Sequence, residues 1–171
     1  MQVGIQMRSS AAAVALLVLA CGPAKSARPA AESAPAPAAV GQRLDIRSIA
    51  VRRTPCFGSC PTFSYEFSRG GMAHYEGGRF ATDTGKRVAP FDSAAFARMA
   101  NQVVAAGFFE SPAEFPLRIT DLPGWEIRVT VSDSVHRVDW TGGSEGVPER
   151  VKRLATSLAD SGAALAWKRE P

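Results

Sequence analysis

Histidine is nearly absent from this sequence, with only His74 and His136 among 171 residues. Neither comes after Ser144, although Gly142–Gly146 fits the G-x-S-x-G pattern of a nucleophile elbow. That motif requires a strand buried on both faces, a helix directly after it and a later triad histidine. We therefore predict a loop between a strand and a helix at this position, and no catalytic residues.

An excess of positive charge is also missing. The chain has 20 Lys and Arg against 16 Asp and Glu, a formal net charge of +4. One of these basic residues, Arg8, lies in a predicted signal peptide whose removal leaves about +3. Nucleic-acid binding requires basic residues clustered on one face of a domain. We therefore predict no nucleic-acid partner.

The apolar run near the N-terminus is too short to cross a membrane. Ala11–Ala20 has about ten residues, whereas a spanning helix needs about 20. A single basic residue, Arg8, precedes the run, which is the pattern of a secretory signal peptide over residues 1–20. The sequence leaves open whether Met1 or Met7 is the true start.

The signal ends in a cysteine. Val18–Cys21 resembles a lipobox, in which small or aliphatic residues precede a cysteine that is diacylated and becomes the new N-terminus. The resemblance implies a lipid on Cys21, and hence a membrane partner through this anchor. Gly22 follows instead of Asp, and by resemblance to Gram-negative lipoproteins this implies the outer membrane, facing the periplasm. An ordinary signal peptide with a chance cysteine is the alternative.

A segment poor in large apolar residues follows. Residues 22–41 are mostly Ala, Pro, Ser and Gly, a composition that buries little and favours disorder. Four prolines oppose a helix: Pro23, Pro29, Pro35 and Pro37. We predict a lipidated N-terminus and disordered tether over residues 21–43, about 25 Å long as a coil or roughly 60 Å as polyproline.

Three cysteines are an odd number for an exported protein. Acylation of Cys21 leaves Cys56 and Cys60, which we expect to form a disulfide in an oxidising compartment. Pro55 and Gly58 suit a tight turn between them. A ring this short stabilises the fold by only about 2 kcal/mol, so we expect it mainly to fix the shape of one loop.

Residues 44–167 are predicted to form the folded domain, with 168–171 as a tail. Ile49 and Val51 mark a first strand, and residues 63–68 alternate aromatic and polar side chains. A three-residue turn at 69–71 is favoured for the following hairpin, because it sets apolar residues opposite apolar ones on the same face. The expected pairs are Phe67 with Ala73, Tyr65 with Tyr75, and Glu66 with His74.

Later elements follow the same reasoning. We predict a strand at 86–89, a helix from Asp92 to Gly107 and a helix from Pro148 to Gly162, from their capping and end signals. A hairpin with its turn at Asp133-Ser134 lies between the helices. Its expected pairs are Val129 with Val138, Ile127 with Trp140, and Arg128 with Asp139. The predicted fold class is α+β: a single two-layer domain with an antiparallel sheet of five to six strands and two helices on one face.

The segment Arg53–Pro61, followed by the aromatic strand, resembles the signature of a bacterial family, domain of unknown function 6438. Its members are similar in a lipoprotein signal, two close cysteines and a later Thr-Asp-x-Pro step, here Thr120–Pro123. The resemblance covers Ile46–Leu158 and implies no activity.

The spacing Cys56-x-x-x-Cys60-Pro61 also resembles the copper motif of Sco-type assembly proteins, with His136 as a third ligand. Those proteins continue from the cysteines into a helix, whereas here Pro61 leads into a strand. A zinc site with both histidines is disfavoured, because His74 and His136 are far apart in sequence and an exported cysteine pair oxidises. We predict no metal and no cofactor, and keep copper binding or thiol redox work as the alternative function.

Phe57, at the tip of the cysteine loop near Arg52 and Arg53, is the predicted interaction surface, because exposed aromatics beside arginine are typical interface anchors. Whether Phe57 instead folds back onto the sheet is left open. Asp121 precedes Leu122-Pro123, which is typical of a turn, and it is a further candidate for binding. The function we predict is a non-enzymatic envelope lipoprotein that binds another protein or a wall or envelope component.

Overall fold

The computed structural model describes residues 44–117, 119 and 121–170. The predicted signal peptide, Cys21 and the tether lie outside these residues. No helix in the described part of the chain is long and apolar enough to span a membrane.

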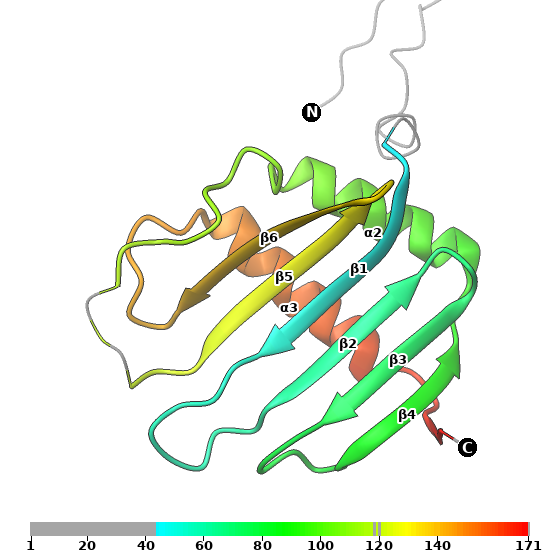
Figure 1. Cartoon of the computed structure of the whole chain (residues 1–171), viewed down its shortest axis with the longest axis horizontal. Helices are drawn as coiled ribbons and strands as arrows, with labels where there is room; N and C mark the ends of the chain where they lie inside the picture. Colours follow the sequence, from blue (N-terminus) through cyan, green and yellow to red (C-terminus); the bar gives the residue numbers. More distant parts are fainter. Residues whose placement is uncertain (1–43, 118, 120, 171) are drawn as a thin grey trace, which may run out of the picture. The chain divides into compact units, whose positions relative to one another are not determined.

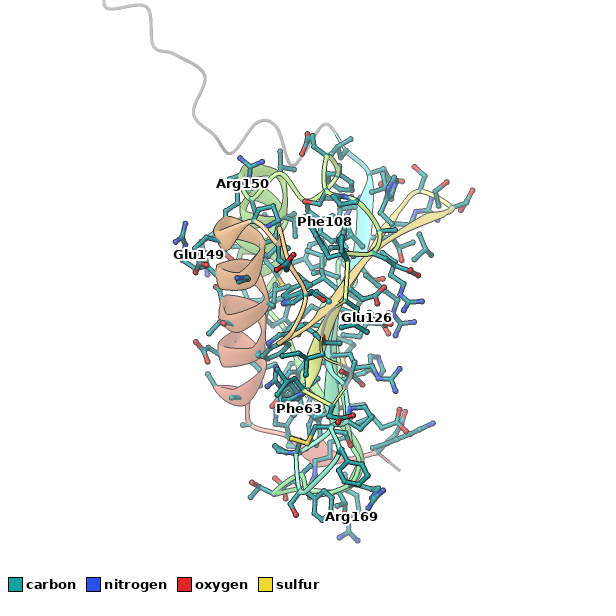
Figure 2. All side chains as sticks on the ribbon, turned by 90° about the vertical axis from the view of Figure 1, so that its left-hand side faces the viewer. Phe63, Phe108, Glu126, Glu149, Arg150 and Arg169 are labelled. Carbon is teal, nitrogen blue, oxygen red and sulfur yellow. A yellow bond between two sulfur atoms is a disulfide. The ribbon has the colours of Figure 1, made fainter. Side chains whose placement is uncertain are left out.

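The domain is built on one antiparallel sheet with strand order β6-β5-β1-β2-β3-β4-β7 (Figure 1). Its strands are β1 Ile46–Arg53, β2 Phe63–Ser68, β3 Met72–Gly77, β4 Gly85–Pro90, β5 Gly124–Val131, β6 Ser134–Thr141 and β7 Lys168–Arg169. Two helices, α2 (Ser93–Ala105) and α3 (Glu149–Ala163), cover one face of the sheet and leave the other open (Figures 1 and 2). The α+β class is therefore confirmed, but the sheet has seven strands where five to six were predicted.

The extra strand, β7, lies in the segment predicted as a tail. Trp167 stacks on the ring of Tyr65 with a centroid distance of 5.6 Å, and its indole N–H donates to the Gly162 carbonyl oxygen at 2.9 Å. This anchor brings the next two residues alongside β4, where Arg169 pairs with Arg87. A two-residue strand has no sequence periodicity of its own, so the alternation pattern cannot predict it.

The core lies between the helices and the inner face of the sheet. Side chains alternate along each strand, so that Ile49 and Val51 of β1 and Ile127 and Val129 of β5 are fully buried. Each such aliphatic side chain contributes about 1.5–3 kcal/mol when fully buried. Helix α3 contributes four further buried side chains to this core: Val151, Leu154, Ala155 and Leu158.

The first hairpin has the predicted register. Phe67 lies opposite Ala73, and Tyr65 lies opposite Tyr75. Gly71 adopts a φ of +89° in the three-residue turn, a conformation that side chains other than glycine rarely allow.

The register predicted for the second hairpin is wrong. Ile127 lies opposite Val138 and not Trp140, and Val129 lies opposite His136 and not Val138. The partners are shifted by two residues. Since a shift of two keeps every side chain on its face, the apolar alternation fits both registers equally well.

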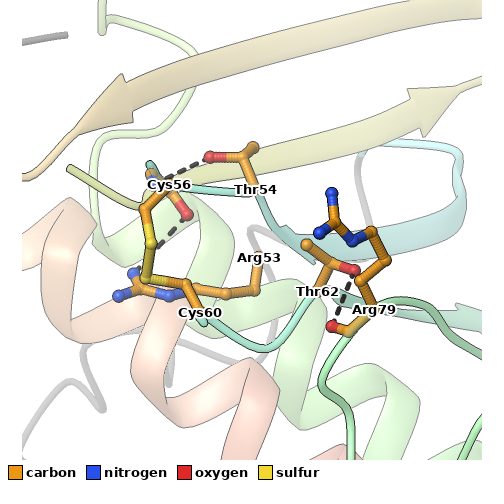
Figure 3. Close-up of a disulfide and its surroundings, with 7 residues drawn as sticks. Arg53, Thr54, Cys56, Cys60, Thr62 and Arg79 are labelled. Atoms are coloured by element: carbon orange, nitrogen blue, oxygen red, sulfur yellow. Dashed lines mark hydrogen bonds between the residues drawn. A yellow bond between two sulfur atoms is a disulfide. The ribbon is translucent and has the colours of Figure 1, made fainter. Parts of the chain in front are cut away.

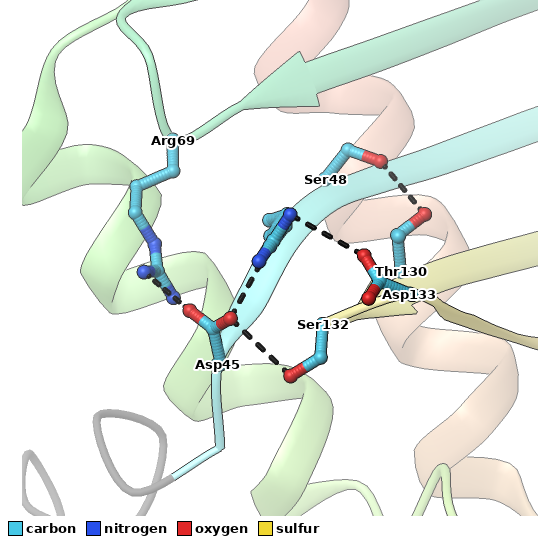
Figure 4. Close-up of polar contacts among 7 residues, drawn as sticks. Asp45, Ser48, Arg69, Thr130, Ser132 and Asp133 are labelled. Atoms are coloured by element: carbon cyan, nitrogen blue, oxygen red, sulfur yellow. Dashed lines mark hydrogen bonds and ion pairs between the residues drawn. The ribbon is translucent and has the colours of Figure 1, made fainter.

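The turn between β5 and β6 accounts for the shift. It consists of Ser132-Asp133, and Ser132 adopts a φ of +51°. The backbone N–H of Ser132 donates to the carbonyl oxygen of Asp45 at 2.8 Å, and its hydroxyl lies 3.3 Å from the Asp45 carboxylate (Figure 4). Arg128 therefore lies opposite Arg137, and its predicted pairing with Asp139 is wrong.

Helix α2 begins and ends as predicted. The Asp92 carboxylate accepts the backbone N–H of Ala95 at 2.9 Å, and Phe91 and Phe96 are both buried. Gly107 follows the helix with a φ of +64°, the left-handed conformation that commonly terminates helices.

Helix α3 starts after Pro148 as predicted, but Gly162 does not end it. The helix continues to Ala163. Gly162 lies against Tyr65, where an added Cβ would come within 2.4 Å of the ring. The glycine therefore allows close packing of α3 on β2 and does not terminate the helix.

Candidate interaction surface

Cys56 and Cys60 form the predicted disulfide, with their Cα atoms 5.7 Å apart (Figure 3). The bond closes the loop between β1 and β2. From Cys60 the chain runs through Pro61 and Thr62 directly into β2, and no helix follows. This local structure favours a structural disulfide over the Sco-type arrangement, in which a helix follows the cysteines.

The base of the cysteine loop is fixed to the start of β5. The backbone N–H of Thr54 donates to the Gly124 carbonyl oxygen at 3.0 Å, and the Gly124 N–H donates to Thr54 Oγ1 at 2.8 Å. A Cβ on Gly124 would lie 2.3 Å from the carbonyl oxygen of Trp140. Only glycine therefore allows β5 to start this close to both neighbours.

The tip of the loop projects into solvent. Phe57 is 91% exposed, so it does not fold back onto the sheet. Its backbone N–H donates to the carbonyl oxygen of Asp121 at 3.2 Å, which joins the cysteine loop to the segment before β5. The structure thus places two of the predicted surface residues, Phe57 and Asp121, side by side.

The two predicted arginines lie on opposite faces of the sheet. Arg52 is on the open face, opposite Ser64 of β2. Arg53 is on the helix face, with its guanidinium carbon 4.6 Å from the ring centroid of Trp125. Partial burial lowers the pKa of Arg53.

Exposed apolar side chains that were not predicted from the sequence lie in the segment that bonds to the cysteine loop through Asp121. We define the apolar loop surface as Phe57, Leu117, Ile119 and Leu122, which are all exposed. Leu122 follows the residue bonded to the cysteine loop, and Ile119 and Leu122 pack near Gly143 and Gly142 of the neighbouring loop. The segment at 112–123 has no helical or strand period. The signal for this surface in the sequence is the presence of large apolar residues in a segment without such a period.

The loop at Gly142–Gly146 is a turn between β6 and α3, as predicted. Ser144 Oγ accepts the backbone N–H of Thr141 at 3.0 Å, and Leu117 forms an isolated bridge with Ser144. The serine therefore helps to shape the turn and to hold the segment that carries Leu117.

The two histidines lie apart from the cysteine loop. His74 is on β3, opposite Glu66, and His136 packs edge-on against Phe109 with ring centroids 5.1 Å apart. In residues 44–117, 119 and 121–170, no group of three or more His, Cys, Asp or Glu side chains is placed to hold a metal ion.

An aromatic cleft of about 380 Å³ adjoins the cysteine loop on the helix face. Tyr65, Tyr75 and Trp167 line it, with Pro61 at its edge. The Tyr75 hydroxyl donates to the Asp83 carbonyl oxygen at 2.6 Å. Burial raises the pKa of both tyrosines, so they are neutral and stack as aromatic surfaces. The three rings pack on one another beside Pro61.

The family model of a domain of unknown function, DUF6438, matches residues 47–161, more than half of the chain. No curated protein matches the sequence. The cysteine loop, the aromatic hairpin and α2 lie within the matched residues, and α3 does so except for its last two residues. The chain therefore belongs to the DUF6438 family.

Proposed function

We propose that this protein is an envelope lipoprotein whose domain binds a partner protein through the apolar loop surface. Lipid on Cys21 anchors it to the outer membrane, and residues 22–43 form the tether. The observation that carries the proposal is the 91% exposure of Phe57 on a loop closed by a disulfide.

The loop surface has the properties of an interface anchor. Large aromatic side chains dominate binding energy when they enter a pocket on a partner, and burying a phenylalanine contributes about 1.5–3 kcal/mol. The disulfide and the bond from Phe57 to Asp121 hold the backbone in place before binding. Less conformational entropy is then lost on association.

The point of tether attachment supports the same proposal. The chain enters the domain at residue 44, before β1, and the cysteine loop follows β1, so the entry point and the loop lie at opposite ends of the strand (Figure 1). An eight-residue strand is about 26 Å long. The apolar loop surface is therefore free to face away from the lipid anchor.

The binding test is a crosslinked pull-down from envelope extracts with Phe57→Ala. Val135→Ala is the matched control, because Val135 is another large exposed apolar side chain, on β6 beside the opposite end of the sheet. We expect Phe57→Ala to lose the partner and Val135→Ala to keep it. Equal recovery of the partner with both variants would show that the loop is not the contact.

The lipid is tested separately by mass spectrometry of the mature N-terminus. We expect a diacylated cysteine at Cys21, and an unprocessed soluble or precursor form in Cys21→Ala. An unmodified Cys21 would refute the anchor and leave the binding test unaffected.

A further inference from the structure

The charged side chains on the open face of the sheet are arranged differently in its two halves. On β5 and β6 the charged side chains pair with each other. Glu126, only 8% exposed, lies 3.1 Å from both Arg128 Nε and Arg137 Nε, and Arg137 Nη2 lies 3.1 Å from Asp139. The two carboxylates of this half are therefore paired with arginines within the sheet.

The centre of the same face has a different arrangement of charged side chains. Two rows cross it, each with a small residue between a basic and an acidic one: Arg128, Ala50 and Glu66, and Arg52, Ser64 and Glu76. Within each row the outer residues are two strands apart, which places their Cα atoms about 10 Å from each other. The strip of the face over Ala50 and Ser64, here called the trough, thus has a basic wall and an acidic wall, and Lys86 of β4 lies beyond the acidic wall, opposite Glu76.

The trough is hollow enough to hold a small molecule. It contains two adjoining depressions of about 320 and 270 Å³, and Ser64, Glu76 and Arg128 line both. The hydroxyl of Ser64 and the side chain of Ala50 are too short to fill the space between the walls.

The charges that face each other across the trough do not pair. Arg52, Glu66 and Glu76 form no ion pair with any residue that the structure describes. Arg128 uses Nε for Glu126, and its side chain is still 48% exposed. The basic wall therefore offers guanidinium donors, and the acidic wall offers carboxylate acceptors.

We propose that this trough binds a zwitterionic ligand, a short peptide with free termini. Its carboxylate would bind Arg52 and Arg128, because the planar guanidinium fork matches a carboxylate in two parallel hydrogen bonds. Its ammonium would bind Glu66 and Glu76. A dipeptide spans about 7 Å when extended, which suits the gap between the walls. A ligand of one sign is attracted by one wall and repelled by the other.

The probe is dialanine, titrated by NMR into the full-length chain while the amides of Ala50 and Ser64 are followed. We expect the peptide with both termini free to bind, and its N-acetylated and C-amidated forms each to bind at least about tenfold more weakly, because each lacks one charge-assisted contact. The L,L and D,D isomers separate two sources of the same chemistry. Tighter binding of L,L points to free peptides, and tighter binding of D,D points to cell-wall peptides.

The walls are tested one at a time. Arg52→Gln and Glu76→Gln are each expected to weaken binding about fivefold or more. Arg69→Gln and Glu149→Gln remove the same charges from exposed sites outside the trough and should leave the affinity within about twofold. Both trough residues are exposed, so unchanged melting temperatures will show that the variants fold.

Three results would overturn the proposal: no shift at any peptide concentration, equal binding of the blocked peptides, or wild-type affinity in both trough variants. None of these results depends on the apolar loop surface. Each experiment therefore tests its own proposal, and failure of one leaves the other unaffected.

Discussion

The two ends of the sheet are built by different means. At the loop end, where β1 ends and β5 begins, long irregular segments carry a disulfide, a closely packed glycine and exposed apolar side chains. At the turn end, where β1 begins, the connections are the short turns at 69–71 and 132–133, held by hydrogen bonds and ion pairs around Asp45 (Figure 4). Irregular backbone needs extra constraints to keep one shape, and the loop end has them. We infer that the turn end serves mainly as scaffold and the loop end as the presented surface.

The largest expected effect comes from the glycine at the loop end. Gly124→Ala places a Cβ 2.3 Å from a backbone oxygen, and we expect the free energy of unfolding to fall by about 3 kcal/mol. Gly70→Ala in the turn end is the control, since its nearest neighbour is a side-chain oxygen at 3.8 Å. Urea unfolding measures both. Equal small losses would mean that the loop end has room to adjust.

The disulfide gives the next effect. Replacing Cys56 and Cys60 together by serine should lower the free energy of unfolding by about 2 kcal/mol, because the unfolded chain is no longer constrained. Amide hydrogen exchange should speed up at 54–62 and stay unchanged in the turn at 69–71. Ser59→Ala, an exposed change inside the same loop, is the control. Unchanged exchange in the loop would show that hydrogen bonds alone hold its shape.

The sequence is most informative where a pattern has one solution. The register of the first hairpin could be predicted, because only a three-residue turn places Phe67 opposite Ala73. A shorter turn would place apolar and polar side chains on the same face. The second hairpin offered two registers with the same faces, and the choice depends on Ser132 bonding to Asp45, a residue 87 positions away. A contact between residues so distant in sequence has no local signature.

The candidate surface also has one part that the sequence predicts and one part that depends on the tertiary fold. The cysteine pair and its loop follow from spacing and compartment, whereas the exposure of Phe57 depends on how the loop sits against Asp121. Leu117 and Ile119 belong to an aperiodic segment, and only the tertiary fold brings that segment against the loop at Gly142–Gly146. The trough on the open face required the correct pairing of β5 with β1, since a row of charges exists only once strand order and register are known.

A smaller effect is expected from the hydroxyl that joins the cysteine loop to β5. Thr54→Val removes the acceptor for the partly buried Gly124 N–H, and an unsatisfied donor of this kind costs about 1.5 kcal/mol. Thr130→Val is the matching change at the turn end, where the lost partner is the Ser48 hydroxyl at 3.0 Å, and should cost about 0.5 kcal/mol. Thermal unfolding of the two variants compares them. The reverse order would show that the turn end depends more on its hydrogen bonds.

The smallest effect concerns charge at the turn end. The pKa of Asp45 lies below its ordinary value of 3.8, because the carboxylate accepts hydrogen bonds from Arg47 and then from Arg69. A pKa that is lowered in the folded state stabilises the fold above the unfolded pKa, and this contribution is lost as the pH falls through the folded value. The loss therefore falls below about pH 4. NMR titration should show the Asp45 pKa rising most in Arg47→Gln, less in Arg69→Gln and not at all in Arg87→Gln, whose arginine pairs with Asp83 instead. Because the Asp45 carboxylate is exposed, 1 M salt should shrink these differences. An Asp45 that titrates normally in the wild-type protein would mean that the short turns alone, without ion pairs, hold the turn end.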